Sequence, residues 1–160
     1  MNAIDMLTTQ HRGMEAALEA VLDAPEELRD DLFEDAADVL MSHVLVEEQY
    51  FYPAVNAKRT ADVLLEALEE HLSLKRLVAD LIELSPRDAR FEAKLHVLKE
   101  QAEHHHKEEE KKLFPTVKKL LTAAELDALG DTMFAAQKAL LPKQPRERAA
   151  DQSKAAAKLA

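Results

Sequence analysis

The chain has 160 residues, of which 47% are apolar and 32% charged, and a formal net charge of −10; this fits one globular domain with a sizeable core. It contains no cysteine, which excludes disulfides, thiolate-bound metals, iron–sulfur clusters and a cysteine nucleophile. No apolar run reaches the roughly 18 residues that a membrane span needs, and no secretory signal opens the chain. We therefore expect a cytoplasmic protein without a membrane partner.

Charge and composition narrow the fold class and the partners. Residues 142–160 contain five basic and two acidic residues, so this tail carries +3 and the rest of the chain −13. An acidic body argues against nucleic acid as the main partner. Ala, Leu, Glu and Lys, which favour helices, dominate the composition, whereas glycine occurs only twice. Sheet proteins need more turn residues than this, so we predict an all-α fold.

The first two helices are predicted from apolar residues that recur every three or four positions. One helix spans residues 4–22, and its inward stripe is Ile4, Leu7, His11, Met14, Leu18 and Val21. A second begins after Pro25, since proline and the acids that follow it suit a first turn. Pro53 is expected to kink or end this helix. Its stripe is Leu32, Ala36, Val39, His43, Val46, Glu47 and Tyr50.

Three further helices follow. Thr60 is predicted to cap the third, whose stripe is Leu64, Ala67, His71, Leu74, Val78 and Leu81. Ser85 and Pro86 open the fourth, which Pro115 breaks late. Its stripe is Phe91, Leu95, Leu98, Ala102, His105, Glu109, Leu113 or Lys112, and Thr116. A capping box at Thr122 and Glu125 starts a fifth helix that ends near Leu141.

Short connections between long amphipathic helices predict an antiparallel, up-down-up-down four-helix bundle. We assign this bundle to residues 1–120. Residues 121–141 form an accessory helix that packs across one end or side of the bundle. Residues 142–160 form a basic tail, which we expect to be solvated and flexible rather than an anion-binding segment.

Four histidines replace apolar residues on the inward stripes, one on each bundle helix: His11, His43, His71 and His105. The carboxylates Glu47 and Glu109 each lie four residues after one of these histidines, on the same helix face. The other histidines are out of phase. His96 lies half a revolution from His105, while His104 and His106 lie about 100° to either side of it. We therefore expect only the middle histidine of the triplet to face the core.

Six buried polar groups without partners would cost several kcal/mol, and a metal removes this penalty. The alternative is a plain bundle in which the histidines are structural, form buried ion pairs or hold one zinc. We favour a metal site, because one inward histidine on every helix is hard to explain by packing. The predicted ligands are His11, His43, Glu47, His71, His105 and Glu109.

The ligands belong to an internal repeat. Residues 43–53 and 105–115 both follow the pattern H-x-x-x-E-E-x-x-x-[aromatic]-P. A further histidine precedes each copy, by 32 residues at His11 and by 34 at His71. Each half is thus a helical hairpin that donates two histidines and one glutamate. A two-fold ligand set of this kind indicates two metals rather than one.

This doubled motif resembles the hemerythrin-like domain, also called the HHE cation-binding domain, over residues 1–120. The resemblance implies a four-helix bundle around two iron ions, which histidines cap and carboxylates bridge, with an oxo or hydroxo group completing the bridge. It implies the same six ligands. Oxygen-carrying hemerythrins have a second histidine one turn after the third-helix histidine, where this chain has Lys75. That departure argues against reversible oxygen carriage.

These ligands would leave about four positions open on two six-coordinate irons. We therefore expect a non-haem di-iron protein that takes O₂, NO or peroxide, in sensing or in oxidative or nitrosative stress. A peroxide-consuming, catalase-like enzyme is the alternative, and manganese or zinc also suit nitrogen and oxygen ligands. Glu48 and Glu110 lie about 100° from the ligand stripe, and we expect them to be solvated rather than to contact the ligands. Tyr50, one turn beyond Glu47, is expected to pack or to donate a hydrogen bond.

Overall fold

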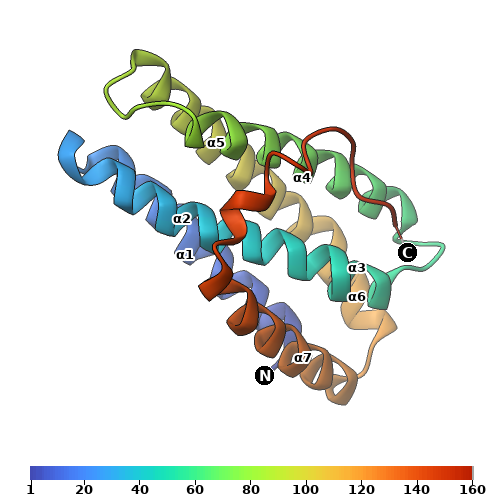
Figure 1. The fold of residues 1–160 in the computed structure, drawn as a ribbon. Helices are drawn as coiled ribbons and strands as arrows, with labels where there is room; N and C mark the ends of the chain where they lie inside the picture. Colours follow the sequence, from blue (N-terminus) through green and yellow to red (C-terminus); the bar gives the residue numbers. More distant parts are fainter. Residues whose placement is uncertain (160) are drawn as a thin grey trace.

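The computed structural model describes residues 1–159, which form helices and no β-strand (Figure 1). Four long helices make the bundle: α1 (Ala3–Asp23), α2 (Glu26–Val46), α4 (Ala61–Ile82) and α5 (Ala89–Glu108). α1 packs against α2 and α5, and α4 packs against α5 and α2, which closes a ring of four. The predicted all-α, up-down-up-down architecture is confirmed.

Side chains cap the N-termini of α1 and α5, but the capping residues are not always the ones that the sequence predicted. The Asn2 carboxamide accepts the Ile4 N–H at 2.9 Å and caps α1. The carboxylate of Asp88, and not the pair Ser85–Pro86, starts α5 by accepting the Arg90 N–H. Thr60 precedes α4, but its hydroxyl donates to the Val55 carbonyl instead of capping. An N-cap side chain satisfies backbone N–H groups that the first turn leaves free, which explains why Asp88 sets the start of α5.

Neither Pro53 nor Pro115 ends its helix. The π-helical turn η1 (Glu47–Phe51) follows α2 and leads into α3 (Tyr52–Val55); η2 (Glu109–Leu113) follows α5 and leads into α6 (Phe114–Leu120). The Tyr52 N–H donates to the Glu47 carbonyl and the Phe114 N–H to the Glu109 carbonyl, each five residues back. The extra residue in each turn brings the following aromatic ring inward, and both rings are buried. Single π-turns of this kind are frequent at functional sites.

The core consists of two apolar clusters with the histidine layer between them. One cluster includes Val21, Phe33 and Phe91, and the other Phe51 and Leu64. The predicted stripes of α1 and α4 are buried throughout. In α2, however, Leu32 is 37% exposed, and Phe33 is buried in its place. The Phe33 ring lies 5.7 Å from that of Phe91, and this larger buried aromatic area sets the rotation of the helix.

A fifth helix, α7 (Ala123–Leu140), begins with the predicted capping box and packs on α1 and α2 (Figure 1). Gly130 lets the start of α1 approach α7 closely, since a Cβ there would lie 1.9 Å from the Met1 carbonyl oxygen. Within the described residues, no helix is both long and apolar enough to cross a membrane.

The segment after α7 turns back across the bundle through two short 3₁₀ helices, η3 (Leu141–Lys143) and η4 (Pro145–Arg148). η4 contacts α2 and α4. Arg146 bonds the Asp38 carboxylate at 2.6 Å, and Arg76 donates to the Ser153 carbonyl at 2.9 Å. The flexibility of the tail stays a prediction, but residues 146–153 do contact the bundle.

Candidate metal centre

All six predicted ligands converge in the middle of the bundle, each at most 1% exposed. α1, α2, α4 and α5 provide one histidine each, and Glu47 and Glu109 are the first residues of the two π-turns. Their ligand atoms form two groups, within each of which all atoms lie within 4.8 Å of one another. One group is His11, His43, Glu47 and Glu109; the other is Glu47, His71 and His105. Two buried His/Glu clusters that share a carboxylate are consistent with a dimetal site.

The two carboxylates lie between the histidines of the two hairpins. Glu47 has Oε1 at 3.0 Å from the Nε2 of His43 and Oε2 at 3.0 Å from the Nε2 of His71. Glu109 Oε1 lies 3.3 Å from the Nε2 atoms of both His11 and His105. Each carboxylate therefore reaches a histidine from either hairpin. Glu47 does so through its two different oxygens, as a carboxylate that bridges two metals requires, whereas Glu109 does so through Oε1 alone.

The outer nitrogen of each predicted histidine ligand has a polar partner. His71 Nδ1 lies 3.0 Å from Glu48, and His11 Nδ1 lies 3.0 Å from Glu110. The other two partners are Gln10 for His43 and Glu70 for His105, both at 2.9 Å. Metal-bound histidines usually donate their second N–H in this way, which fixes the tautomer and the ring orientation. The prediction that Glu48 and Glu110 are solvated is therefore wrong.

Unsatisfied buried atoms test whether these residues fit a metal. Within residues 1–159, the buried side-chain nitrogen and oxygen atoms that lack a hydrogen-bond partner are Nε2 of His11, His43 and His106, and Oε1 of Glu47 and Glu109. All of them lie in this centre. Buried polar atoms are normally satisfied, and these are lone-pair donors of the kind that iron, manganese or zinc accepts. The donor set therefore fits a bound metal.

His106 corrects the prediction that only the middle histidine of the triplet faces inward. The side chain of His104 is 64% exposed, as expected, but His106 is fully buried. Its ring stacks on that of His11, with centroids 4.0 Å apart, and its Nδ1 lies 2.9 Å from Glu15. The angular offset from His105 was right, but α5 packs against α1 on that flank. A helix between two neighbours buries a broad arc, not a single line of residues.

Tyr52, and not Tyr50, is the tyrosine of the site. Tyr50 is only partly buried. The Tyr52 hydroxyl is fully buried, 3.1 Å from Oε2 of Glu109, 3.3 Å from Oε2 of Glu47 and 3.1 Å from Nε2 of His71. In an uninterrupted α-helix Tyr52 would lie about 140° from Glu47 and face away from the centre. The π-turn shifts the register by one residue and turns it inward. The sequence repeat does single out this tyrosine, because Tyr52 is the aromatic residue of its motif.

Burial and mutual contacts shift the pKa values of most groups in the centre, and the shifts keep both carboxylates ionised. Burial alone would raise the pKa of the Glu47 carboxyl, but His43, His105 and His71 hold this pKa well below its ordinary value. Burial raises the pKa of Tyr52 well above its ordinary value, and the two carboxylates add to the effect. Burial lowers the pKa of His43 and of His106. Burial also opposes the charged forms of His11, His71 and His105, but the neighbouring carboxylates outweigh it and raise the pKa of each. The centre thus combines ionised carboxylate oxygens, a protonated phenol, and the neutral imidazoles of His43 and His106.

Lys75, the departure noted in the sequence, is buried with 2% exposure. Its Nζ lies 2.8 Å from Oε1 of Glu48, the carboxylate that also contacts Nδ1 of His71. The lysine therefore positions the partner of a predicted ligand, and the pair Lys75–Glu48 is a buried ion pair whose members satisfy each other.

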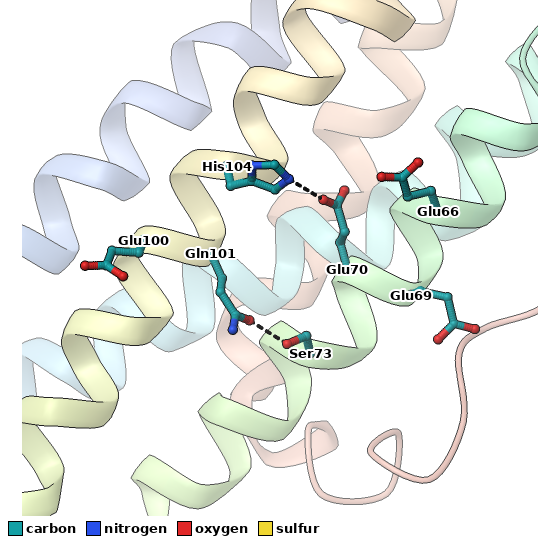
Figure 2. A pocket seen from close by; sticks show the side chains of 7 residues that line it. All are labelled: Glu66, Glu69, Glu70, Ser73, Glu100, Gln101 and His104. Atoms are coloured by element: carbon teal, nitrogen blue, oxygen red, sulfur yellow. Dashed lines mark hydrogen bonds and ion pairs between the residues drawn. The ribbon is translucent and has the colours of Figure 1, made fainter.

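An acidic pocket of about 390 Å³ lies outside the centre, between α4 and α5 (Figure 2). Its lining is Glu66, Glu69, Glu70, Ser73, Glu100, Gln101 and His104. Figure 2 shows His104 turned toward Glu70, at 3.3 Å. Glu70 also contacts Nδ1 of His105. One glutamate thus separates the pocket from the centre, and none of the predicted ligands lines the pocket.

Comparisons with known proteins agree with this geometry. The family model "Hemerythrin HHE cation binding domain" matches residues 2–142. A crystal structure of a "Hemerythrin HHE cation binding domain-containing protein", the Rv2633c homolog from Mycobacterium kansasii, superposes with a TM-score of 0.79 at 25% identity and covers 89% of each chain. The uncharacterized proteins Rv2633c of Mycobacterium tuberculosis and Mb2666c of Mycobacterium bovis are each 30% identical over 138 residues, 84% of each chain.

The bundle and its buried His/Glu clusters define a cation-binding helical protein. The chain belongs to the hemerythrin HHE cation-binding domain family.

Proposed function

We propose that the chain binds two iron ions and presents their open positions to a small ligand such as O₂, NO or peroxide, in sensing or in the response to oxidative or nitrosative stress. The observation that carries the proposal is the set of unsatisfied buried nitrogen and oxygen atoms, together with two carboxylates that each reach both hairpins. The six predicted ligands are His11, His43, Glu47, His71, His105 and Glu109.

When bound, the iron pair would supply redox-active positions for a small ligand. Glu47 and Glu109 would offset only two positive charges of the iron pair, so further anionic ligands would be favoured. The chain contributes orientation: Glu48, Glu110, Gln10 and Glu70 hold the outer nitrogens, so that the inner nitrogens point at the centre. Apolar clusters on both sides exclude bulk water, which restricts access to small molecules.

Tyr52 favours a second candidate function, the consumption of peroxide. Its hydroxyl is a buried proton donor between the two carboxylates, and its raised pKa keeps the proton in place. The phenol would therefore act as a hydrogen-bond donor that orients a peroxide next to the two carboxylates. The binding protein and the enzyme would use the same residues and differ in turnover.

Metal analysis of iron-loaded protein tests the proposal. We expect two irons per chain and an oxo-to-iron absorption band. Fewer than two irons per chain after loading would overturn it, and less than one metal per chain would favour a structural or single-zinc bundle. Oxygen evolution from peroxide, measured with an electrode, separates the two functions. Loss of rapid evolution in Tyr52→Phe, with two irons retained, would assign the enzyme, whereas iron-bound protein without turnover would assign the binding protein.

A further inference from the structure

We infer that His106 is a third histidine ligand on the metal position formed by His11 and His43, so that the two metal positions are unequal. The inference rests on the proposed function, because it presupposes a metal pair. It deepens that function by placing the open positions mainly on the opposite side, at His71 and His105.

The position of the ring is the first argument. One ligand nitrogen from each of His11, His43 and His106 lies within 4.8 Å of the other two, and all three rings are buried. The Nε2 atom of each ring lacks a hydrogen-bond partner. Three unsatisfied nitrogens that face one small volume are arranged as ligands of a single metal. The Oε1 atoms of Glu47 and Glu109 make no hydrogen bond either, although they lie 3.0 Å from Nε2 of His43 and 3.3 Å from Nε2 of His11. Lone-pair atoms this close are stabilised by a cation that they share.

The outer nitrogen is the second argument. His106 Nδ1 lies 2.9 Å from Glu15, just as a polar side chain holds Nδ1 of each of the four predicted histidine ligands. A carboxylate on Nδ1 places the proton there and leaves Nε2 as a free lone pair, the form that binds metal. The exposed His104, which contacts Glu70 of α4 through Nε2, does not share this arrangement.

The sequence repeat supplies the third argument. His106 follows the histidine of its motif by one residue, and Val44 holds the same place in the other copy. Val44 is buried as well, so the fold accepts an apolar side chain at this point. Stacking on His11 alone would be served equally by an apolar or aromatic ring, without the cost of an unsatisfied buried nitrogen. A metal at Nε2 removes that cost.

Three histidines and two carboxylate oxygens leave one free position on a six-coordinate metal on the His11 side. The other side has two histidines, because Lys75 pairs with Glu48 instead of facing the centre. A small ligand would then bind next to His71 and His105, where the Tyr52 hydroxyl lies 3.1 Å from His71.

The test compares ⁵⁷Fe-loaded wild type with His106→Phe, which keeps a ring to stack on His11 but removes the ligand nitrogen. His104→Phe, one helical step before the metal ligand His105 but exposed, is the matched control. In Mössbauer spectra the wild type should give two distinct doublets of equal area. In His106→Phe one doublet should shift or disappear while the other is unchanged, and one iron should transfer to a chelator at least about ten times faster. His104→Phe should match the wild type.

His106→Gln, which is smaller and keeps a donor toward Glu15, replaces the phenylalanine variant if that one fails to fold; the same changes are expected. Two irons with wild-type spectrum and release rate in the folded variant would overturn the assignment of His106 and leave the proposed function intact. Fewer than two irons in the wild type would instead overturn the proposed function itself, and this inference with it.

Discussion

The two helical hairpins carry the same predicted ligands but differ in what surrounds them. In both, the second glutamate of the motif crosses to the first histidine of the other hairpin: Glu48 contacts His71, and Glu110 contacts His11. In both, the residue before the first histidine supports the second histidine, Gln10 in one hairpin and Glu70 in the other. These four contacts therefore follow the repeat and give the centre an approximate two-fold symmetry.

The differences lie at the positions where the repeat diverges. Tyr52 directs a hydroxyl into the centre, whereas Phe114, its counterpart, stacks at 5.9 Å on His11 without a polar atom. Lys75 pairs with Glu48, whereas Glu15, one turn after His11, contacts His106. The comparison teaches that the predicted ligands and their supporting contacts are duplicated between the hairpins, whereas the chemical differences come from a few neighbouring side chains.

Removing a shared carboxylate should break the centre most completely. We expect Glu47→Ala to lose both irons, because this glutamate belongs to both ligand groups. Metal content by mass spectrometry measures the effect, and Gln49→Ala, exposed and two residues away, is the control. Retention of two irons in Glu47→Ala would contradict a bridging role.

Removing His105 from the histidine triplet should weaken iron binding at one of the two ligand groups more than at the other. His105→Ala should lose at least one iron per chain, because the ring belongs to only one of the two ligand groups. His104→Ala should keep the wild-type content, since its side chain is 64% exposed. Equal iron retention in the two variants, measured after desalting, would contradict the assignment of the centre.

Glu48 and Glu110 each contact a histidine of the other hairpin and occupy equivalent positions, but their loss should weaken iron binding to different degrees. Glu48→Gln and Glu110→Gln should each weaken iron binding about 10- to 100-fold, the usual effect of losing the partner of a metal-bound histidine. Glu48→Gln should be the more severe, because it also leaves the buried Lys75 without a full counter-charge. Chelator competition measures both. A larger loss in Glu110→Gln would contradict this ranking.

The smallest effect is expected from the fifth helix, which packs on the first hairpin. Gln137 of α7 donates to the Ser42 hydroxyl at 3.0 Å and accepts from Gln10 at 2.6 Å, which in turn contacts His43. Gln137→Leu should lower the free energy of unfolding by about 1–2 kcal/mol in urea denaturation, since it leaves buried polar partners unsatisfied. Thr132→Ala, on the exposed side of α7, should change it by about 0.5 kcal/mol or less. Equal effects would show that the network adds no stability.

The sequence alone determined the helical architecture and the convergence of six polar residues. Helical periodicity is a local property, and a histidine on an apolar helix face is buried together with that face. The stripes of α1 and α4 and the inward positions of His11 and His71 followed from this rule without tertiary information. The doubled motif then indicated that two hairpins meet, because each alone would leave its histidines and glutamate unpartnered.

Only the tertiary structure decided which flanking residues join the centre. His106 is buried because α1 covers that flank of α5, and Tyr52 enters because a π-turn changes the helical phase after Glu47. Glu48 and Glu110 make their contacts across hairpins, over separations of 23 and 99 residues. Periodicity describes a single straight helix, so it cannot report which neighbour covers a flank or where the helix changes its pitch.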